Sequence, residues 1–319
     1  MNDVVRAAGL LRAGELVAFP TETVYGLGAD AANPRAIARI FAAKGRPADH
    51  PLIVHLPDAS QLGHWAVDIP EAAHRLAAAF WPGPLTLILR RHASVSDAIT
   101  GGQDTVGLRV PNHPLALQLL REFDGGVAAP SANRFGRISP TTAAHVREEL
   151  GTAVAMILDG GPCAVGIEST ILDLSGIKAR ILRPGMLDAV AIAGVLGYPP
   201  ELGGERNSPR VSGNLEAHYA PATELQLVAA ADFPQALQAA LAAGRRIAVL
   251  ADPQLLRAHP GIACYPASPD PVRYANDLYA GLRELDALGG DLILVAAPPA
   301  EAAWRAVNDR LRRAAAGSK

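Results

Sequence analysis

The stretch NPRAIARIFAAKGRPADHPLIVHL, Asn33 to Leu56, contains a helix signal, a turn and a strand signal in that order. Asn33 and Pro34 are residues favoured at the start of a helix, and Gly45 is the residue favoured just after its end. The apolar run PLIVHL then predicts a strand. The stretch therefore predicts a helix that is followed, after a basic turn, by a strand of a sheet.

The same alternation extends in both directions from this stretch. Strands are predicted at ELVAFP, LTLILR, TVGLRVP, GGVAAP, AVAMILDG, STILDLS and ARILRPG. Helices are predicted before ELVAFP and at 69–81, 114–123 and 141–150. This order predicts an α/β fold with helices covering a sheet. Because STILDLS and ARILRPG have only a short turn between them, they should be antiparallel, which makes the sheet mixed.

The composition changes after Tyr198, and this change predicts the domain organisation. Residues 1–198 form the first predicted domain, and residues 199–222, rich in Pro, Gly, Ser and charge, read as a linker. Residues 223–319 contain strands separated by helical segments, which predicts a smaller Rossmann-like α/β domain with a parallel sheet.

Composition and charge narrow the class of protein. Of the 319 residues 50% are hydrophobic and 19% are charged, which is typical of a globular chain, and the formal net charge is −2. A broad nucleic-acid-binding face usually carries a strong positive excess, so the balance favours a small-molecule partner. Cys163 and Cys264 are the only cysteines, which argues against a disulfide framework or zinc cage and favours the cytoplasm. Pro82 and Pro84 interrupt the most apolar stretch, so we expect no membrane span.

Three arginines are candidate anion-binding groups. Arg46 lies in a turn bounded by Gly and Pro, Arg109 lies inside the apolar run TVGLRVP, and Arg183 lies in ILRPG. A buried arginine is costly unless an anion pairs with it. Each arginine therefore either pairs with a nearby Asp or Glu, or contributes to a site for an anionic ligand.

Polar turns follow or precede several of the predicted strands. PTETVYGLG, APSAN and GIESTILD contribute Thr23, Ser131 and Ser169, which either form plain turns or bind a polar ligand. The sequence has neither a GxxxxGK[ST] loop nor a GxGxxG motif, so a nucleotide would need another cradle for its phosphates. Without an HExxH pair or a Ser-His-Asp order, we do not expect zinc or nucleophilic hydrolysis.

In combination, PTETVYGLG, KGRPADHPLIVH, WPGPLTLIL, TVGLRVPNHP, APSAN, GIESTILD and ILRPG resemble the threonylcarbamoyl-AMP synthase family. The resemblance covers nearly all of the first domain, and HYAP with the C-terminal domain resembles the two-domain form of that family. It implies a YrdC-like twisted mixed sheet with helices on its faces, joined by a linker to the Rossmann-like domain.

The resemblance implies a nucleotidyltransferase reaction. L-threonine, bicarbonate and ATP would give L-threonylcarbamoyl-adenylate, pyrophosphate and water. A separate transferase would use this product for the threonylcarbamoyl-adenosine modification of tRNAs that read codons beginning with A. Strong direct binding of tRNA is not expected.

The resemblance also implies roles for individual residues. L-threonine would be bound by Thr23, His55, Arg109 and Ser169. ATP would be bound by Arg46, His50, Thr105, Ser131, Ser139, Arg183 and Tyr219. Lys44 and Arg46 would stabilise charge, and no side chain is assigned as an acid or base. Mg²⁺ is expected with ATP, held mainly by phosphate and water, and the sequence shows no carboxylate cage for it.

Two positions depart from the family pattern, and one hypothesis concerns the linker. His50 stands where the family often has Asn, and both residues can donate a hydrogen bond. Ala129 stands where a family Thr contacts the amino acid, so only its backbone could serve. Tyr219 of HYAP either reaches back over the first domain's site and excludes water, or anchors the domain boundary.

Three other functions remain alternatives. The first domain could be a non-catalytic RNA-binding module, which the near-neutral charge disfavours. It could resemble the carbamoyl-adenylate makers of hydrogenase maturation, but those carry Cys-rich zinc modules that two cysteines cannot build. It could also be an inactive relative, against which the complete motif set argues.

Overall fold

The computed structural model describes residues 2–205, 208–213, 215–256, 259 and 261–318. The chain divides into two compact units. The first comprises residues 1–135 and 140–214, and the second comprises residues 136–139 and 215–319. The predicted linker, 199–222, is thus divided between the units, and each unit is described by itself.

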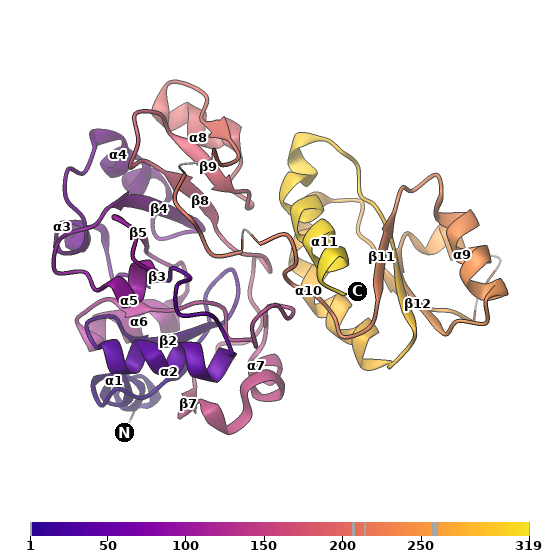
Figure 1. The fold of residues 1–319 in the computed structure, drawn as a ribbon, viewed down its shortest axis with the longest axis horizontal. Coiled ribbons are helices and arrows are strands. Elements are labelled where there is room, and N and C mark those ends of the chain that lie inside the picture. Colours follow the sequence, from indigo (N-terminus) through magenta and orange to yellow (C-terminus); the bar gives the residue numbers. More distant parts are fainter. Residues whose placement is uncertain (1, 206–207, 214, 257–258, 260, 319) are drawn as a thin grey trace. The chain divides into compact units, whose positions relative to one another are not determined.

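The first unit is built on a ten-stranded mixed sheet (Figure 1). Its strands are β1 (Val17–Phe19), β2 (Gly26–Asp30), β3 (Ile53–His55), β4 (Leu85–Arg90), β5 (Thr105–Arg109), β6 (Val127–Ala128), β7 (Met156–Ile157), β8 (Thr170–Asp173), β9 (Arg180–Arg183) and β10 (Glu201–Leu202). Their order in space is β10-β9-β8-β4-β5-β3-β6-β2-β1-β7. The predicted mixed sheet is confirmed, and so is the antiparallel pairing of β8 with β9.

Eight α-helices are described in this unit. They are α1 (Asp3–Arg12), α2 (Pro34–Lys44), α3 (Leu62–Trp65), α4 (Glu71–Phe80), α5 (Asp97–Thr100), α6 (Pro114–Phe123), α7 (Ala143–Leu150) and α8 (Ala189–Leu196). The start of α2 is as predicted, because the Asn33 side chain accepts hydrogen bonds from the amides of Arg35 and Ala36. Its end is also as predicted, since Gly45 adopts a φ of 61°, in the left-handed region that glycine enters without strain.

The two faces of the sheet are covered differently. One face packs its apolar side chains against α2, α4 and α8 in the main core. The other face is covered by α1 and α6 where it is formed by β1 and β6. Over β4, β8 and β9 this second face instead carries a small apolar cluster, Ile88, Ile171 and Leu182, against which Val211 packs. Polar side chains of the same strands lie beside that cluster and form the candidate site.

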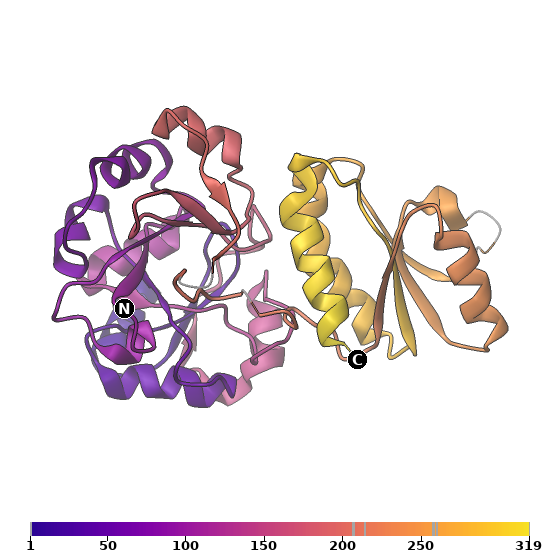
Figure 2. The same cartoon turned by 45° about the horizontal axis from the view of Figure 1, so that its top comes forward.

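The second unit is a parallel α/β sheet, as the sequence predicts. Its strands are β11 (Leu225–Val228), β12 (Ile247–Ala251), β13 (Ala263–Pro266) and β14 (Leu292–Ala296), in the order β11-β14-β12-β13. Every described pair in this sheet is parallel. Helices α10 (Pro271–Ala287) and α11 (Arg305–Gly317) lie on one face, and α9 (Phe233–Ala242) lies on the other (Figure 2).

None of the helices described here has both the length and the apolar character needed to cross a membrane. Pro82 and Pro84 lie between α4 and β4.

Candidate active site

The strand pairings bring the ends of several strands to one edge of the sheet. β3 and β5 run parallel and end at His55 and Arg109, which are register partners. β4 runs antiparallel to β5 and parallel to β8, so the starts of β4 and β8 lie at that same edge. β9 returns antiparallel to β8 and ends there at Arg183. Residues that are far apart in sequence therefore converge.

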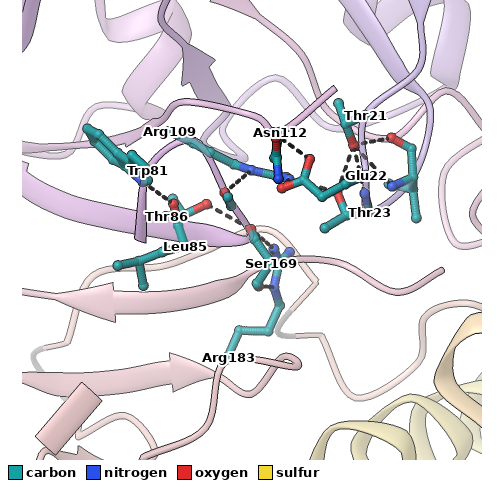
Figure 3. A network of polar contacts seen from close by, with 12 residues as sticks. Thr21, Glu22, Thr23, Trp81, Leu85, Thr86, Arg109, Asn112, Ser169 and Arg183 are labelled. Atoms are coloured by element: carbon teal, nitrogen blue, oxygen red, sulfur yellow. Dashed lines mark hydrogen bonds and ion pairs between the residues drawn. The ribbon is translucent and has the colours of Figure 1, made fainter. Parts of the chain in front are cut away.

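Arg109 is buried and is held on three sides (Figure 3). Its Nη2 lies 2.7 Å from Oε1 of Glu22, its Nη1 donates to Oγ1 of Thr23 at 2.9 Å, and its Nε donates to the carbonyl of Gly83 at 3.2 Å. The second carboxylate oxygen of Glu22 accepts from the amide of Asn112 at 3.0 Å. Of the two alternatives for Arg109, pairing with a carboxylate is therefore present. A guanidinium has five N–H groups, so within the described residues two remain for a ligand.

Arg183 and Ser169 form a second buried group next to this one (Figure 3). Arg183 donates from Nε and Nη2 to the carbonyl of Ser169, at 3.1 and 2.9 Å, and from Nη2 to its hydroxyl at 3.1 Å. The Ser169 hydroxyl is also 2.8 Å from Oγ1 of Thr86 on β4. Ser169 is thus fixed in position by a cation and by a neighbouring strand.

Arg46 and Arg183 converge on a single residue. Nη2 of Arg46 donates to the Ser212 hydroxyl at 3.0 Å, and Nη1 of Arg183 donates to the Ser212 carbonyl at 2.9 Å. Arg46 also donates to the carbonyl of Pro51 at 2.8 Å. Two guanidinium groups that are expected to bind one anionic ligand therefore reach the same place on the first unit.

Lys44, the last residue of α2, is buried. Its Nζ donates to the carbonyl oxygens of Ser131 and Asn133, so it holds the APSAN loop. Burial, together with the nearby charge of Arg46, lowers the pKa of Lys44 well below its ordinary value. This position places the Ser131 loop beside the end of α2 and the basic turn that follows it.

The two histidines of KGRPADHPLIVH have different surroundings. Burial, together with the nearby charge of Arg109, lowers the pKa of His55 to about 3, so its imidazole is neutral at neutral pH. Its ring meets Phe19 edge-on at 6.0 Å between centroids. His50 is only partly buried and packs against Phe135 at 5.3 Å, and burial also lowers its pKa.

Thr105 and Ala129 differ from the residues above, because Thr105 begins its strand and Ala129 offers only its backbone. Thr105 begins β5, so about 13 Å of strand separates it from Arg109. It lines a cavity of about 870 Å³, together with Gln103, Ser175, Lys178 and Arg180 among others. The amide of Ala129 already donates to the carbonyl of Ile53, so a substrate contact would fall to the Ala129 carbonyl.

Ser139 and Tyr219 belong to the second unit. Tyr219 is buried there between His218 and Tyr279, at 4.1 and 5.6 Å between ring centroids, and the guanidinium carbon of Arg310 lies 5.2 Å from its ring centroid. This packing is an anchor within the second unit.

Sequence reasoning missed three residues of the network. Glu22 and Thr21 belong to PTET, whose isolated polar residues also suit a plain turn. Thr86 is the one hydroxyl in the apolar strand LTLILR, and that interruption of an apolar run was the signal that could have identified it. Over the described residues, no three His, Cys, Asp or Glu side chains gather in a way that could hold a metal ion.

Comparisons with known proteins identify the family of this chain. Residues 9–185 match the Sua5–YciO–YrdC family model, described as telomere recombination, and residues 182–316 match the threonylcarbamoyl-AMP synthase C-terminal domain. The chain is 40% identical to a threonylcarbamoyl-AMP synthase of Pyrococcus abyssi, over 97% of this chain and 92% of that protein. A shorter putative threonylcarbamoyl-AMP synthase of Mycobacterium tuberculosis is 42% identical, over 61% of this chain and 89% of its own length.

Among solved structures, the crystal structure of P. abyssi Sua5 complexed with L-threonine matches with a TM-score of 0.92. The identity is 38%, over 99% of this chain and 94% of that chain. Since both family models match, and the matches extend through both units, this chain belongs to the threonylcarbamoyl-AMP synthase family in its two-domain form.

Proposed function

We propose that this protein makes L-threonylcarbamoyl-adenylate. The α-amine of L-threonine and bicarbonate give the carbamate and water, and a carbamate oxygen then attacks the α-phosphorus of ATP and releases pyrophosphate. The sum is L-threonine, bicarbonate and ATP to L-threonylcarbamoyl-adenylate, pyrophosphate and water. Under this proposal the enzyme is a nucleotidyltransferase.

The observation that carries the proposal is the buried pairing around Arg109. The two remaining N–H groups of the guanidinium suit a carboxylate, in a bidentate or a single contact. Glu22 and Thr23 beside it place oxygen acceptors next to that position. A carboxylate with an amine one carbon away, the head of an α-amino acid, fits this pattern of charges. The P. abyssi relative was crystallised with L-threonine, which supports the choice of amino acid.

The nucleotide is assigned to the basic side chains of Arg46, Arg183 and Lys44. The attack joins an anionic carbamate to a polyanion, and fixed positive charge lowers the electrostatic cost of that encounter. Arg46 and Arg183 supply such charge at the place now occupied by Ser212. Lys44 positions the Ser131 loop at their side. Neutral His55 can donate a hydrogen bond to the amino acid without adding charge.

The chain's own groups do not suggest a covalent intermediate. Burial raises the pKa of the Cys163 thiol to about 12, so it is no nucleophile at neutral pH. Magnesium enters as part of the substrate MgATP, because Glu22 is already paired with Arg109 and the described residues offer no carboxylate cage.

Three further expectations remain predictions under this proposal. The adenylate would pass to a separate tRNA threonylcarbamoyl transferase, direct tRNA binding would be weak, and the protein would act in the cytoplasm. The net charge of −2 and the two cysteines support the last two.

The test is to incubate purified protein with MgATP, L-threonine and labelled bicarbonate, and to follow the label into an adenylate. We expect a labelled adenylate and one pyrophosphate per product, both dependent on L-threonine. Absence of labelled adenylate, while the protein is folded and binds both substrates, would refute the proposal. If the first unit were an RNA-binding module, tRNA binding would instead be tight and would weaken steeply with salt.

A further inference from the structure

Thr21 makes an unusual number of contacts for a buried hydroxyl. Its Oγ1 lies 2.7 Å from the carbonyl of Val24 and 2.8 Å from Oγ1 of Thr23. It also accepts from the amides of Thr23 and Val24, at 3.1 and 3.2 Å. A carbonyl oxygen can only accept, so the single proton of Thr21 points to Val24. The 2.8 Å bond between the two hydroxyls is therefore donated by Thr23, and the two longer amide bonds share the remaining lone pair of the Thr21 oxygen.

Counting the proton and the lone pairs of the Thr23 hydroxyl shows which hydrogen bond it can form with a ligand. Its proton is committed to Thr21, and one of its lone pairs accepts from Nη1 of Arg109 at 2.9 Å. Both threonine side chains are buried. The remaining valence of the Thr23 oxygen is one lone pair, so it can accept a hydrogen bond and cannot donate one.

We infer that Thr21 is a positioning residue that makes Thr23 a pure acceptor for the α-amine of the bound amino acid. This inference rests on the proposed function, in which Arg109 binds the carboxylate. The α-amine is one carbon from that carboxylate, and Thr23 Oγ1 is within hydrogen-bond distance of the guanidinium, so the amine is the donor that comes next to it.

The direction of this bond matters for the chemistry. The nitrogen lone pair of the amine forms the new bond to the bicarbonate carbon. A hydroxyl that donated to this lone pair would withdraw it from the reaction. An acceptor instead takes one N–H and leaves the lone pair directed away from Thr23. Glu22, in the same turn, pairs with Arg109 on its other nitrogen, so one short turn orients both groups that meet the amino acid.

The first test uses Thr21→Val, which removes the hydroxyl and keeps the shape, and Thr21→Ser, which keeps the hydroxyl. An unmet buried hydrogen bond should raise KM for L-threonine by about tenfold or more in Thr21→Val. KM for ATP should stay within about twofold, and Thr21→Ser should stay within about threefold of the parent protein for both substrates. The inference is overturned if the two variants behave alike, or if both KM values rise together.

The second test needs no variant, so it holds even if Thr21→Val fails to fold. L-2-hydroxybutyrate carries a donor at the α-position, whereas 2-oxobutyrate carries only an acceptor there. As competitors of L-threonine on the unmodified protein, the hydroxy acid should bind about tenfold or more tightly than the oxo acid. Equal competition by both would overturn the inference. Calorimetry with L-threonine itself distinguishes failure of this inference from failure of the proposed function. A protein that does not bind L-threonine would refute the proposed function.

Discussion

At the scale of single residues, the contacts of Arg109 compensate its buried charge. The side chain is buried, its charge is balanced by Glu22, and each of its three nitrogens meets an oxygen. Breaking a buried ion pair by removing one partner leaves an unbalanced charge in a poorly polarisable medium. Removal of either partner should therefore lower the free energy of unfolding.

We predict that Glu22→Ala lowers the free energy of unfolding by about 3–5 kcal/mol, because Arg109 stays buried without its partner. Urea unfolding at neutral pH measures this. The control is Glu15→Ala, which removes the exposed partner of Arg39 and should change the unfolding midpoint little. Equal effects of the two substitutions would show that the Glu22 pair does not stabilise the fold.

His55 gives a prediction on pH. In the unfolded chain the pKa of His55 is near its ordinary value of 6.5. In the folded protein, mainly because of burial, its pKa is lowered to about 3. Between these two values unfolding takes up a proton, so the stability of the folded state falls as the pH falls. His55→Asn, which cannot titrate, should lose less stability over this window, with a difference of at most about 1.4 kcal/mol per pH unit.

The measurement for His55 is urea unfolding of both proteins at several pH values from neutral down to about 4. Taking the difference between parent and variant cancels the contributions of the other titrating groups. Parallel stability curves for the two proteins would contradict the lowered pKa.

For Arg183 we predict an effect on the binding of both proposed substrates. Arg183→Ala should weaken ATP binding by about 2–5 kcal/mol, the usual effect of truncating one partner of a buried charge pair. It should weaken L-threonine binding as well, because Arg183 donates to both oxygens of Ser169. Calorimetry with each ligand measures the two effects, and exposed Arg147→Ala serves as the control. A change in ATP binding below about 0.5 kcal/mol would remove Arg183 from the site.

At the scale of elements, the site exists because strand ends meet. The start of β8 and the end of β9 must approach closely for Ser169 to reach both Thr86 and Arg183. Gly185, just after β9, permits this approach: a Cβ there would lie 2.5 Å from the amide nitrogen of Thr170. A larger residue would have to push the start of β8 away.

We predict that Gly185→Ala lowers the free energy of unfolding by about 1–3 kcal/mol, the usual effect of overpacking, and weakens L-threonine binding by displacing Ser169. The matched control is Gly176→Ala in the turn between β8 and β9, where a Cβ would meet no atom within 4 Å. Urea unfolding and calorimetry test both proteins. If Gly185→Ala bound L-threonine normally, the close approach would not be needed for the site.

At the scale of the whole molecule, the chain combines a unit that holds the strand-end network with a second parallel α/β unit. The match to the M. tuberculosis relative covers 61% of this chain and 89% of that protein. The carbamate and the mixed anhydride of the proposed reaction both hydrolyse in water, so a segment that excludes water would protect them.

We predict that a chain ending at Gly203 hydrolyses more ATP per adenylate formed than the full chain. The truncated chain keeps β10 but loses Ser212, HYAP and the part of the second unit formed by residues 215–319. Parallel assays of phosphate or AMP release and of labelled adenylate give the ratio. An unchanged ratio would refute the hypothesis that residues after Gly203 shield the site.

The sequence by itself determined the local elements of this protein. Asn33 and Gly45 set the ends of α2, and apolar runs set β4 and β5, because caps and periodicity act over a few neighbouring residues. The short strands β2 and β10 were not predicted, since glycine-rich or two-residue segments show no alternation. The sequence motifs also predicted the family and identified the candidate arginines.

Only the tertiary structure decided which of these groups meet. The strand order β9-β8-β4-β5-β3 gathers His55, Arg109 and Arg183 at one edge, while it leaves Thr105 at the other. The pairing of Glu22 with Arg109 depends equally on that order. Such contacts join segments far apart in the chain, and the free energy that selects them comes from burial and strand pairing across the whole sheet, which no local pattern records.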